Sequence, residues 1–163
     1  MKKIICFVSL LFVLSINAQN FEFINCIIQN DCVKSDTIHQ QLIQNGKFIL
    51  KDIYFDLSGK IYLEYESYNK LDTLVNCLKQ NATINILITA HTDSRGSDTY
   101  NLQFSENCAN VVMKALIDKG ISHDRLKAEG RGKRQPLVSE ETIEDKAINR
   151  RIEIEIIDNL IEE

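Results

Sequence analysis

The sequence predicts an α/β fold, a two-layer sandwich in which helices cover one face of a mixed sheet. Two segments repeat apolar residues with the period of an amphipathic helix, and they alternate with short segments that are typical of strands. The chain has 163 residues, 44% of them hydrophobic, which is enough to bury one core beside additional segments. The predicted order is βαβαββ, behind an N-terminal hairpin arm.

The hairpin arm is predicted from one turn. Asn45-Gly46, a pair strongly favoured in two-residue turns, separates residues 39–44 from residues 47–56. The second segment is rich in branched and aromatic residues, which favour strands. We therefore expect a strand on each side of the turn.

Two helices and a strand follow. Apolar residues spaced at i, i+3, i+4 and i+7 predict the first helix, and they are Leu71, Leu74, Val75 and Leu78. Residues 84–90 are apolar and branched, as in a buried central strand. The second helical stripe consists of Cys108, Val111, Val112, Ala115 and Leu116. Gly120 stands where the C-terminal cap of that helix is expected.

The last part of the domain is predicted to contain two strands. Residues 125–129 form a short candidate strand, and Gly130, Gly132 and Pro136 indicate a loop after it. In the final strand, apolar residues alternate with charged ones, so that one face meets the core and the other meets water. The apolar positions are Ile152, Ile154 and Ile156.

The N-terminus has the pattern of a secretory signal peptide. Lys2 and Lys3 precede the uncharged apolar residues 4–16, and cleavage is expected after Ala18. A membrane anchor is the alternative, but about 13 apolar residues are too few to span a bilayer. We expect export to the periplasm or to the periplasmic side of the outer membrane. The expected division is a signal peptide (1–18), an N-terminal segment (19–45), the main domain (46–157) and a tail (158–163).

Export makes disulfide bonds possible. Cys26 and Cys32 flank a short polar segment and can close a small loop, or they can remain unpaired. Cys77 and Cys108 fall in the predicted helices, where a cysteine is usually a small core residue. The sequence leaves the pairing of Cys26 open.

Charge and residue spacing exclude several functions. The net charge of −4 and a pI near 5.4 argue against a protein that binds nucleic acid or anionic lipid. His39, His91 and His123 are scattered, and no CxxC or HExxH motif is present, so we expect neither a metal site nor a cofactor. His91 and Cys108 lack the third group that orients a catalytic base. We therefore expect a protein that is not an enzyme.

Several separate motifs stand in order within residues 46–157. They are Ile53-Tyr54-Phe55-Asp56, His91-Thr92-Asp93-Ser94-Arg95-Gly96, Tyr100-Asn101-Leu102-Gln103-Phe104-Ser105-Glu106, Gly130-Arg131-Gly132 with Gln135-Pro136, and Asn149-Arg150-Arg151-Ile152-Glu153-Ile154. Together they resemble the OmpA-like peptidoglycan-binding domain, a family that includes outer-membrane proteins, lipoproteins and flagellar stator subunits. Several motifs at matching spacing are a stronger signal than any one alone.

The resemblance implies a site for the diaminopimelate end of a peptidoglycan stem, which carries an ammonium and a carboxylate on one carbon. Asp93 matches the family position that binds the ammonium, and Thr92 and Asn101 match neighbouring polar positions. Positions that support the binding loop are matched by Asn149, Arg150 and Arg151. Cys108 stands where the family has an arginine for the ligand carboxylate, and a thiol cannot make that charged bidentate contact. From the residues alone, Asp93 has the alternative role of a turn former or helix cap.

Two functions of different classes therefore remain open. One is non-covalent binding of peptidoglycan peptide stems in the periplasm. The other is an envelope interaction or structural domain that kept the fold, lost the affinity for peptidoglycan and binds another envelope protein. Losing one charged hydrogen-bonded contact costs about 1.5–3 kcal/mol, or about tenfold to a hundredfold in affinity. The candidate replacements for the missing cation are Arg95, Arg150 and Arg151.

Overall fold

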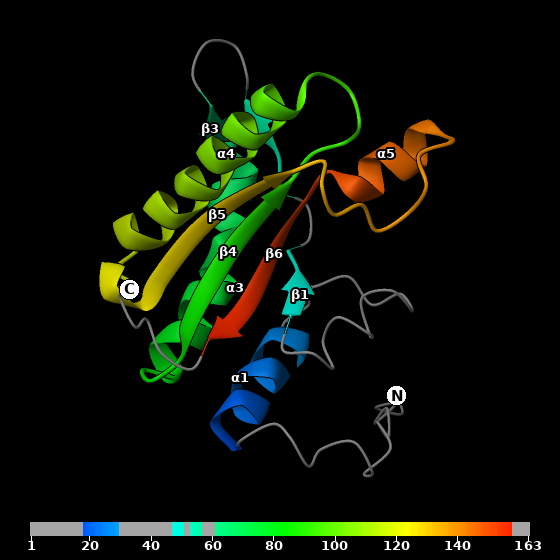
Figure 1. Ribbon diagram of the computed structural model, residues 1–163. Helices are drawn as coiled ribbons and strands as arrows, with labels where there is room; N and C mark the ends of the chain where they lie inside the picture. The colour runs from blue at the N-terminus through cyan, green and yellow to red at the C-terminus, as the bar shows by residue number, and fades with distance from the viewer. Residues whose placement is uncertain (1–17, 30–46, 51–52, 57–60, 158–163) are drawn as a thin grey trace, which may run out of the picture.

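The computed structural model describes residues 18–29, 47–50, 53–56 and 61–157. Its elements are α1 (Ala18–Gln29), β1 (Lys47–Ile49), β2 (Phe55–Asp56), β3 (Tyr62–Leu63), α3 (Tyr65–Gln80), β4 (Asn85–His91), α4 (Asp98–Asp118), the 3-10 turn η2 (His123–Arg125), β5 (Leu126–Gly132), α5 (Ile143–Asn149) and β6 (Arg151–Ile157). Figure 1 shows α3 and α4 running along the main sheet, with α5 at the end toward which β4 and β5 point. None of the described helices is both long enough and apolar enough to cross a membrane.

The main sheet has the strand order β1-β6-β4-β5, and β2 pairs with β3 in a separate ladder. β4 and β5 are parallel and are joined through α4, whereas β6 is antiparallel to both of its neighbours, β4 and β1. The register places Ile88 of β4 opposite Ala128 of β5 and Ile154 of β6. The predicted α/β fold with a mixed sheet is confirmed.

One face of the sheet is apolar and forms the core with the helices. Successive side chains of a strand point to opposite faces, so Ile86 and Ile88 share a face with their partners Ile156 and Ile154. The predicted stripe of the first helix enters this core through Leu71, Leu74, Val75 and Leu78. The intervening positions of β4 and β6 include buried polar side chains, which are Thr89, His91, Arg151 and Glu153.

The two ends of α4 are capped. The Ser97 hydroxyl accepts a hydrogen bond from the backbone N–H of Tyr100 (3.2 Å), as is typical of an N-cap. At the other end, Gly120 adopts φ = 93° as predicted, and its N–H donates to the carbonyl of Ile117 (2.8 Å). The N-cap starts the helix soon after β4 ends at His91, so residues 92–97 form a short loop between the two elements.

The glycines after residue 129 belong to a strand, not to the predicted loop. β5 continues to Gly132, which pairs with His91 of β4, and α4 packs against this strand. A Cβ atom at Gly130 would overlap the backbone nitrogen of Glu106 and the hydroxyl of Ser105. That hydroxyl also accepts a hydrogen bond from the N–H of Gly132 (2.9 Å). The two glycines therefore permit a close helix–strand approach.

The N-terminal elements differ from the predicted arm. Residues 47–56 do not form one strand, because β1 pairs with β6 and β2 pairs with β3. Residues 39–46, with the predicted first strand and turn, lie outside the described residues. The helices α1 and α5 were not expected. α5 starts with a capping box, in which Thr142 and Asp145 each accept a hydrogen bond from the other's backbone N–H.

The structure also corrects the interpretation of Cys77. This residue is buried in α3, as expected, but it forms a disulfide bond with Cys26 of α1. Helix α1 packs against α3 and brings the two Cα atoms to 5.8 Å, although 51 positions separate the residues in sequence. Cys26 is therefore not paired with Cys32, which itself lies outside the described residues. Cys108 is free and buried, in agreement with its prediction as a core residue.

Candidate functional site

A cavity of about 670 Å³ opens where β4 ends. Its wall combines the loop after β4, the first turns of α4, residues of the β1–β2 segment, and the junction between α5 and β6. Six of the seven predicted site residues line it, namely Thr92, Asp93, Asn101, Cys108, Arg150 and Arg151. The fold thus brings together side chains that are up to 59 positions apart, counted from Thr92 to Arg151.

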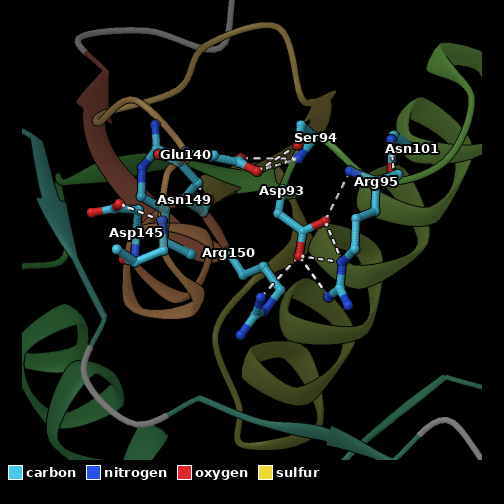
Figure 2. Close-up of polar contacts among 10 residues, drawn as sticks. Asp93, Ser94, Arg95, Asn101, Glu140, Asp145, Asn149 and Arg150 are labelled. Atoms are coloured by element: carbon cyan, nitrogen blue, oxygen red, sulfur yellow. Dashed lines mark hydrogen bonds and ion pairs between the residues drawn. The ribbon is translucent and has the colours of Figure 1, made fainter.

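Asp93 is the acidic residue of the cavity lining. Its side chain is only 6% exposed and accepts hydrogen bonds from Nε (3.1 Å) and Nη2 (2.7 Å) of Arg95. Nη1 of Arg150 donates to the same carboxylate at 2.8 Å, as Figure 2 shows. The hydrogen bonds from Arg95 above all, and then those from Arg150, outweigh burial and lower the pKa of Asp93 from 3.8 to about 2. Asp93 is therefore ionised at neutral pH.

The two arginines on Asp93 differ in exposure. The side chain of Arg95 is 69% exposed and that of Arg150 is 45% exposed, so both guanidinium groups remain accessible from the cavity side. One carboxylate with two guanidinium groups carries a net charge of +1. The cluster therefore combines a buried anion with a surplus of accessible positive charge.

Cys108 is part of the cavity wall but adds no charge. It is 4% exposed, and burial raises the pKa of its thiol to about 12. A neutral thiol in the wall leaves room where a longer side chain would stand. The positive charge at Asp93 comes instead from Arg95 and Arg150.

The loop that carries Asp93 is held at three points. The Asn101 side chain donates to the carbonyl of Arg95 (2.7 Å), and Lys133 Nζ donates to the carbonyl of Gly96 (3.0 Å). The carboxylate of Glu140 accepts hydrogen bonds from the N–H (2.9 Å) and the hydroxyl (2.6 Å) of Ser94. These contacts come from α4 and from the segment between β5 and α5, so the position of the loop depends on distant parts of the chain.

Asn149 supports the loop indirectly and is not itself part of the cavity lining. It is fully buried, its Oδ1 accepts from the N–H groups of Leu137 (2.8 Å) and Val138 (3.2 Å), and its Nδ2 donates to Glu140 (2.9 Å). Because Glu140 in turn holds Ser94, Asn149 acts on the loop through one intermediate side chain (Figure 2). This role is that of a positioning residue.

The neighbouring residues Arg151 and Arg150 have different partners. Arg151 is buried, its Nε donates to Glu153 (2.7 Å), and its two Nη atoms donate to the carbonyls of Asn149 (3.1 Å) and Gln135 (3.0 Å). Burial lowers the pKa of Arg151, while Glu153 opposes that shift. Arg151 is thus a structural cation, and Arg150 is the one that reaches Asp93.

Two buried polar groups near Asp93 have no hydrogen-bond partner among the described residues. The Thr92 hydroxyl is one, and it belongs to a cavity-lining residue. The ring of His91 is the other, with Nε2 3.6 Å from Glu153, and burial lowers the pKa of His91 so that the neutral form dominates. Within the described ranges, no three His, Cys, Asp or Glu side chains gather as metal ligands would.

Sequence reasoning missed two residues of this site. Lys133 and Glu140 hold the loop across 37 to 46 positions of sequence, and no local spacing links them to it. Both lie in the polar stretch after β5, which the sequence presents only as a loop. Their role follows from the parallel pairing of β4 and β5, which places the two loops side by side.

Comparisons with known proteins show which proteins this chain is similar to. Outer membrane protein A of Bordetella avium is 38% identical over 106 residues, which make up 65% of this chain and 54% of that protein. The peptidoglycan-binding protein ArfA of Mycobacterium bovis is 34% identical over 100 residues, 61% of this chain and 29% of that protein. The solved peptidoglycan-associated lipoprotein of Burkholderia pseudomallei has a TM-score of 0.55 at 27% identity, and covers 64% of this chain and 86% of that one.

The extent of these matches defines what they show. This chain spans about half the length of the Bordetella protein and under a third of the Mycobacterium protein, so the likeness concerns one domain. The sequence model of the OmpA family matches residues 54–150, which contain β4, α4, β5 and the cluster around Asp93. With a match over more than half of its length, the chain belongs to the OmpA family.

Proposed function

We propose that this protein binds peptidoglycan non-covalently, through the diaminopimelate end of the peptide stem. Membership of the OmpA family supports this function, as do the relative named a peptidoglycan-binding protein and the structure named a peptidoglycan-associated lipoprotein. The observation that carries the proposal is Asp93, a buried carboxylate that lies between two accessible arginines at the cavity wall.

The charges of the cluster match those of the proposed ligand. A carbon that bears both an ammonium and a carboxylate requires an anion and a cation side by side. Asp93 is ionised and provides the anion. Arg150, 2.8 Å from it and 45% exposed, provides the cation that the helix position of Cys108 lacks.

Binding in this arrangement requires one exchange of partners. Arg95 covers Asp93 in the structure, but its side chain is 69% exposed, so water can solvate the guanidinium when it rotates away and the ligand ammonium replaces its contacts. The ligand ammonium takes the place of that guanidinium, while the backbone N–H of Arg95 keeps its bond to Oδ1 of Asp93 (3.1 Å). The buried hydroxyl of Thr92 gains a partner when a ligand fills the cavity.

The proposed setting is the periplasm, or the periplasmic side of the outer membrane, reached through the signal peptide of residues 1–18. The proposed action is binding without catalysis. The cavity thiol supports this, because at a pKa of about 12 Cys108 is protonated at neutral pH and is a poor nucleophile.

A second candidate function is an envelope interaction domain without peptidoglycan affinity. The observation that favours it is Cys108, because the wall position of the family arginine is neutral. In that case the net positive cluster at Asp93 only stabilises the loop. The two functions differ in whether the protein binds isolated cell wall.

Co-sedimentation with purified peptidoglycan sacculi tests the proposal. The protein is expected in the pellet, to be released by free diaminopimelate, and to stay in the supernatant when Asp93 is changed to Ala. Asp118→Ala is the matched control, because that carboxylate is exposed on the last turn of α4 and pairs with Lys114, away from the cavity. Wild-type protein in the supernatant would favour the second function, and an Asp93→Ala variant in the pellet would refute the site.

A further inference from the structure

The acceptor positions of the Asp93 carboxylate are taken up by groups of the protein itself. Oδ1 accepts from the backbone N–H (3.1 Å) and from Nε (3.1 Å) of Arg95. Oδ2 accepts from Nη2 of Arg95 (2.7 Å) and from Nη1 of Arg150 (2.8 Å). An ionised carboxylate offers about four acceptor positions, so these donors fill them. A ligand ammonium can therefore bind Asp93 only after one of the donors has left.

The donor that can leave most readily is the guanidinium of Arg95. Arg95 and Arg150 reach the carboxylate from different sides, as Figure 2 shows. The side chain of Arg95 is the more exposed of the two, at 69% against 45%. Arg95 lies in the loop between β4 and α4, two residues after Asp93, so its side chain can rotate into water while the helices and strands stay in place.

The loop does not depend on this guanidinium for its position. The Asn101 side chain donates to the backbone carbonyl of Arg95 (2.7 Å), and the backbone N–H of Arg95 donates to Asp93 (3.1 Å). Both bonds use backbone atoms of residue 95 and remain when its side chain is shortened. The guanidinium can therefore leave Asp93, or be removed by mutation, without loss of the bonds that hold the binding acid.

A second anion lies within reach of the charge on Arg95. Glu140 accepts hydrogen bonds from the N–H (2.9 Å) and the hydroxyl (2.6 Å) of Ser94, the residue before Arg95. The hydrogen bonds to Asp93 above all, and also the charge of Glu140, raise the pKa of Arg95. Glu140 therefore attracts the guanidinium when it leaves Asp93, which favours a second position in which the site is open.

We propose that Arg95 is an internal competitor of the ligand, whose guanidinium closes the site by occupying Asp93 until the ammonium of the stem displaces it. This inference rests on the proposed stem binding at Asp93, and it identifies a residue that weakens that binding. The competitor belongs to the same chain as Asp93, so its effective concentration does not fall when the protein is diluted. The two arginines on Asp93 thus have opposite effects, because Arg150 supports the ligand and Arg95 competes with it.

Isothermal titration calorimetry with the free stem tripeptide that ends in diaminopimelate tests the inference. Arg95→Ala removes the guanidinium and keeps the backbone bonds of residue 95, and it is expected to tighten binding by about three- to tenfold. Arg95→Lys keeps the charge without the planar fork and is expected to give a smaller gain. Arg134→Ala is the matched control, because that arginine is exposed and lies outside the cavity wall, and it should change the affinity by less than about twofold.

The dependence of the affinity on salt gives a second readout. In the wild type the ligand ammonium replaces one ion pair of Asp93 by another, whereas in Arg95→Ala it forms an ion pair where none stood before. Salt screens exposed ion pairs. Raising the salt concentration is therefore expected to weaken binding more in Arg95→Ala than in the wild type, and equal salt dependence would contradict the competition.

The outcomes separate this inference from the proposed function. If the wild type binds the tripeptide and Arg95→Ala binds it equally or more weakly, Arg95 does not compete, and the inference is wrong while stem binding stands. If only Arg95→Ala binds measurably, both the competition and the stem site are supported. If neither protein binds the tripeptide, the proposed function fails and the inference fails with it.

Discussion

The disulfide bond between Cys26 and Cys77 is expected to contribute a large share of the stability of the protein. It closes a chain segment with a sequence separation of 51, and the loss of loop entropy in the unfolded state for that length corresponds to about 4 kcal/mol. Residual structure in the unfolded chain reduces this value, so we expect 2–4 kcal/mol, roughly the typical range for a disulfide. The bond joins α1 to α3, and Phe23 and Ile27 of α1 are part of the core. Its loss therefore removes the covalent link between α1 and the rest of the core and is expected to lower the free energy of unfolding.

Urea unfolding at equilibrium measures this contribution. The oxidised wild type is compared with the Cys26→Ala/Cys77→Ala variant, and Cys32→Ala serves as the control that keeps the bond. The double variant is expected to lose about 2–4 kcal/mol of unfolding free energy. A loss below about 1 kcal/mol, or an equal loss in the control, would refute the assignment of the bond to this pair.

Three further predictions concern Asp93 and Cys108 at the site and Gly130, where β5 packs against α4. The folded pKa of Asp93, about 2, lies below its ordinary 3.8, so its ion pairs stabilise the protein above pH 4, and that stability is lost as the pH falls toward 2. Asp93→Asn should lower the free energy of unfolding by about 2 kcal/mol at pH 7. It should also weaken the fall of that free energy between about pH 4 and pH 2, as measured by urea unfolding, and an unchanged fall would contradict the ion pairs. Gly130→Ala should destabilise by about 1–3 kcal/mol or more in thermal unfolding, because its Cβ would overlap backbone of Glu106, and a neutral effect would disprove that close approach. Cys108→Arg should tighten stem binding by less than about threefold if Arg150 already provides the cation, whereas about a tenfold gain would show that Arg150 does not.

The helices and strands with periodic apolar residues could be predicted, because the spacing of those residues shows which face of the element is buried. Leu71, Leu74 and Leu78 face one core from one helix, and Ile152 and Ile154 face it from one strand, so local spacing carries the information. Gly130 and Gly132 misled the same reasoning. A glycine needed for close packing against a helix leaves the same mark in sequence as a glycine in a turn.

The composition of the site could be predicted only in part. Asp93 follows a buried strand within a motif, and that position was accessible to sequence reasoning. The pairing of Asp93 with Arg150 joins residues 57 positions apart, and that of Cys26 with Cys77 joins residues 51 apart. Such contacts depend on strand order and helix packing, which local periodicity does not encode. Glu140 and Lys133 are missing from the predicted site for the same reason.

The most direct test of the central claim is the affinity of the Arg150→Ala variant for the free stem tripeptide, measured by isothermal titration calorimetry. Removal of one charged partner is expected to weaken binding by about tenfold to a hundredfold. Arg134→Ala removes an exposed arginine that is not part of the cavity wall and should change the affinity by less than about twofold. A wild type that binds the tripeptide no better than Arg150→Ala would contradict the claim that Arg150 replaces the missing helix arginine.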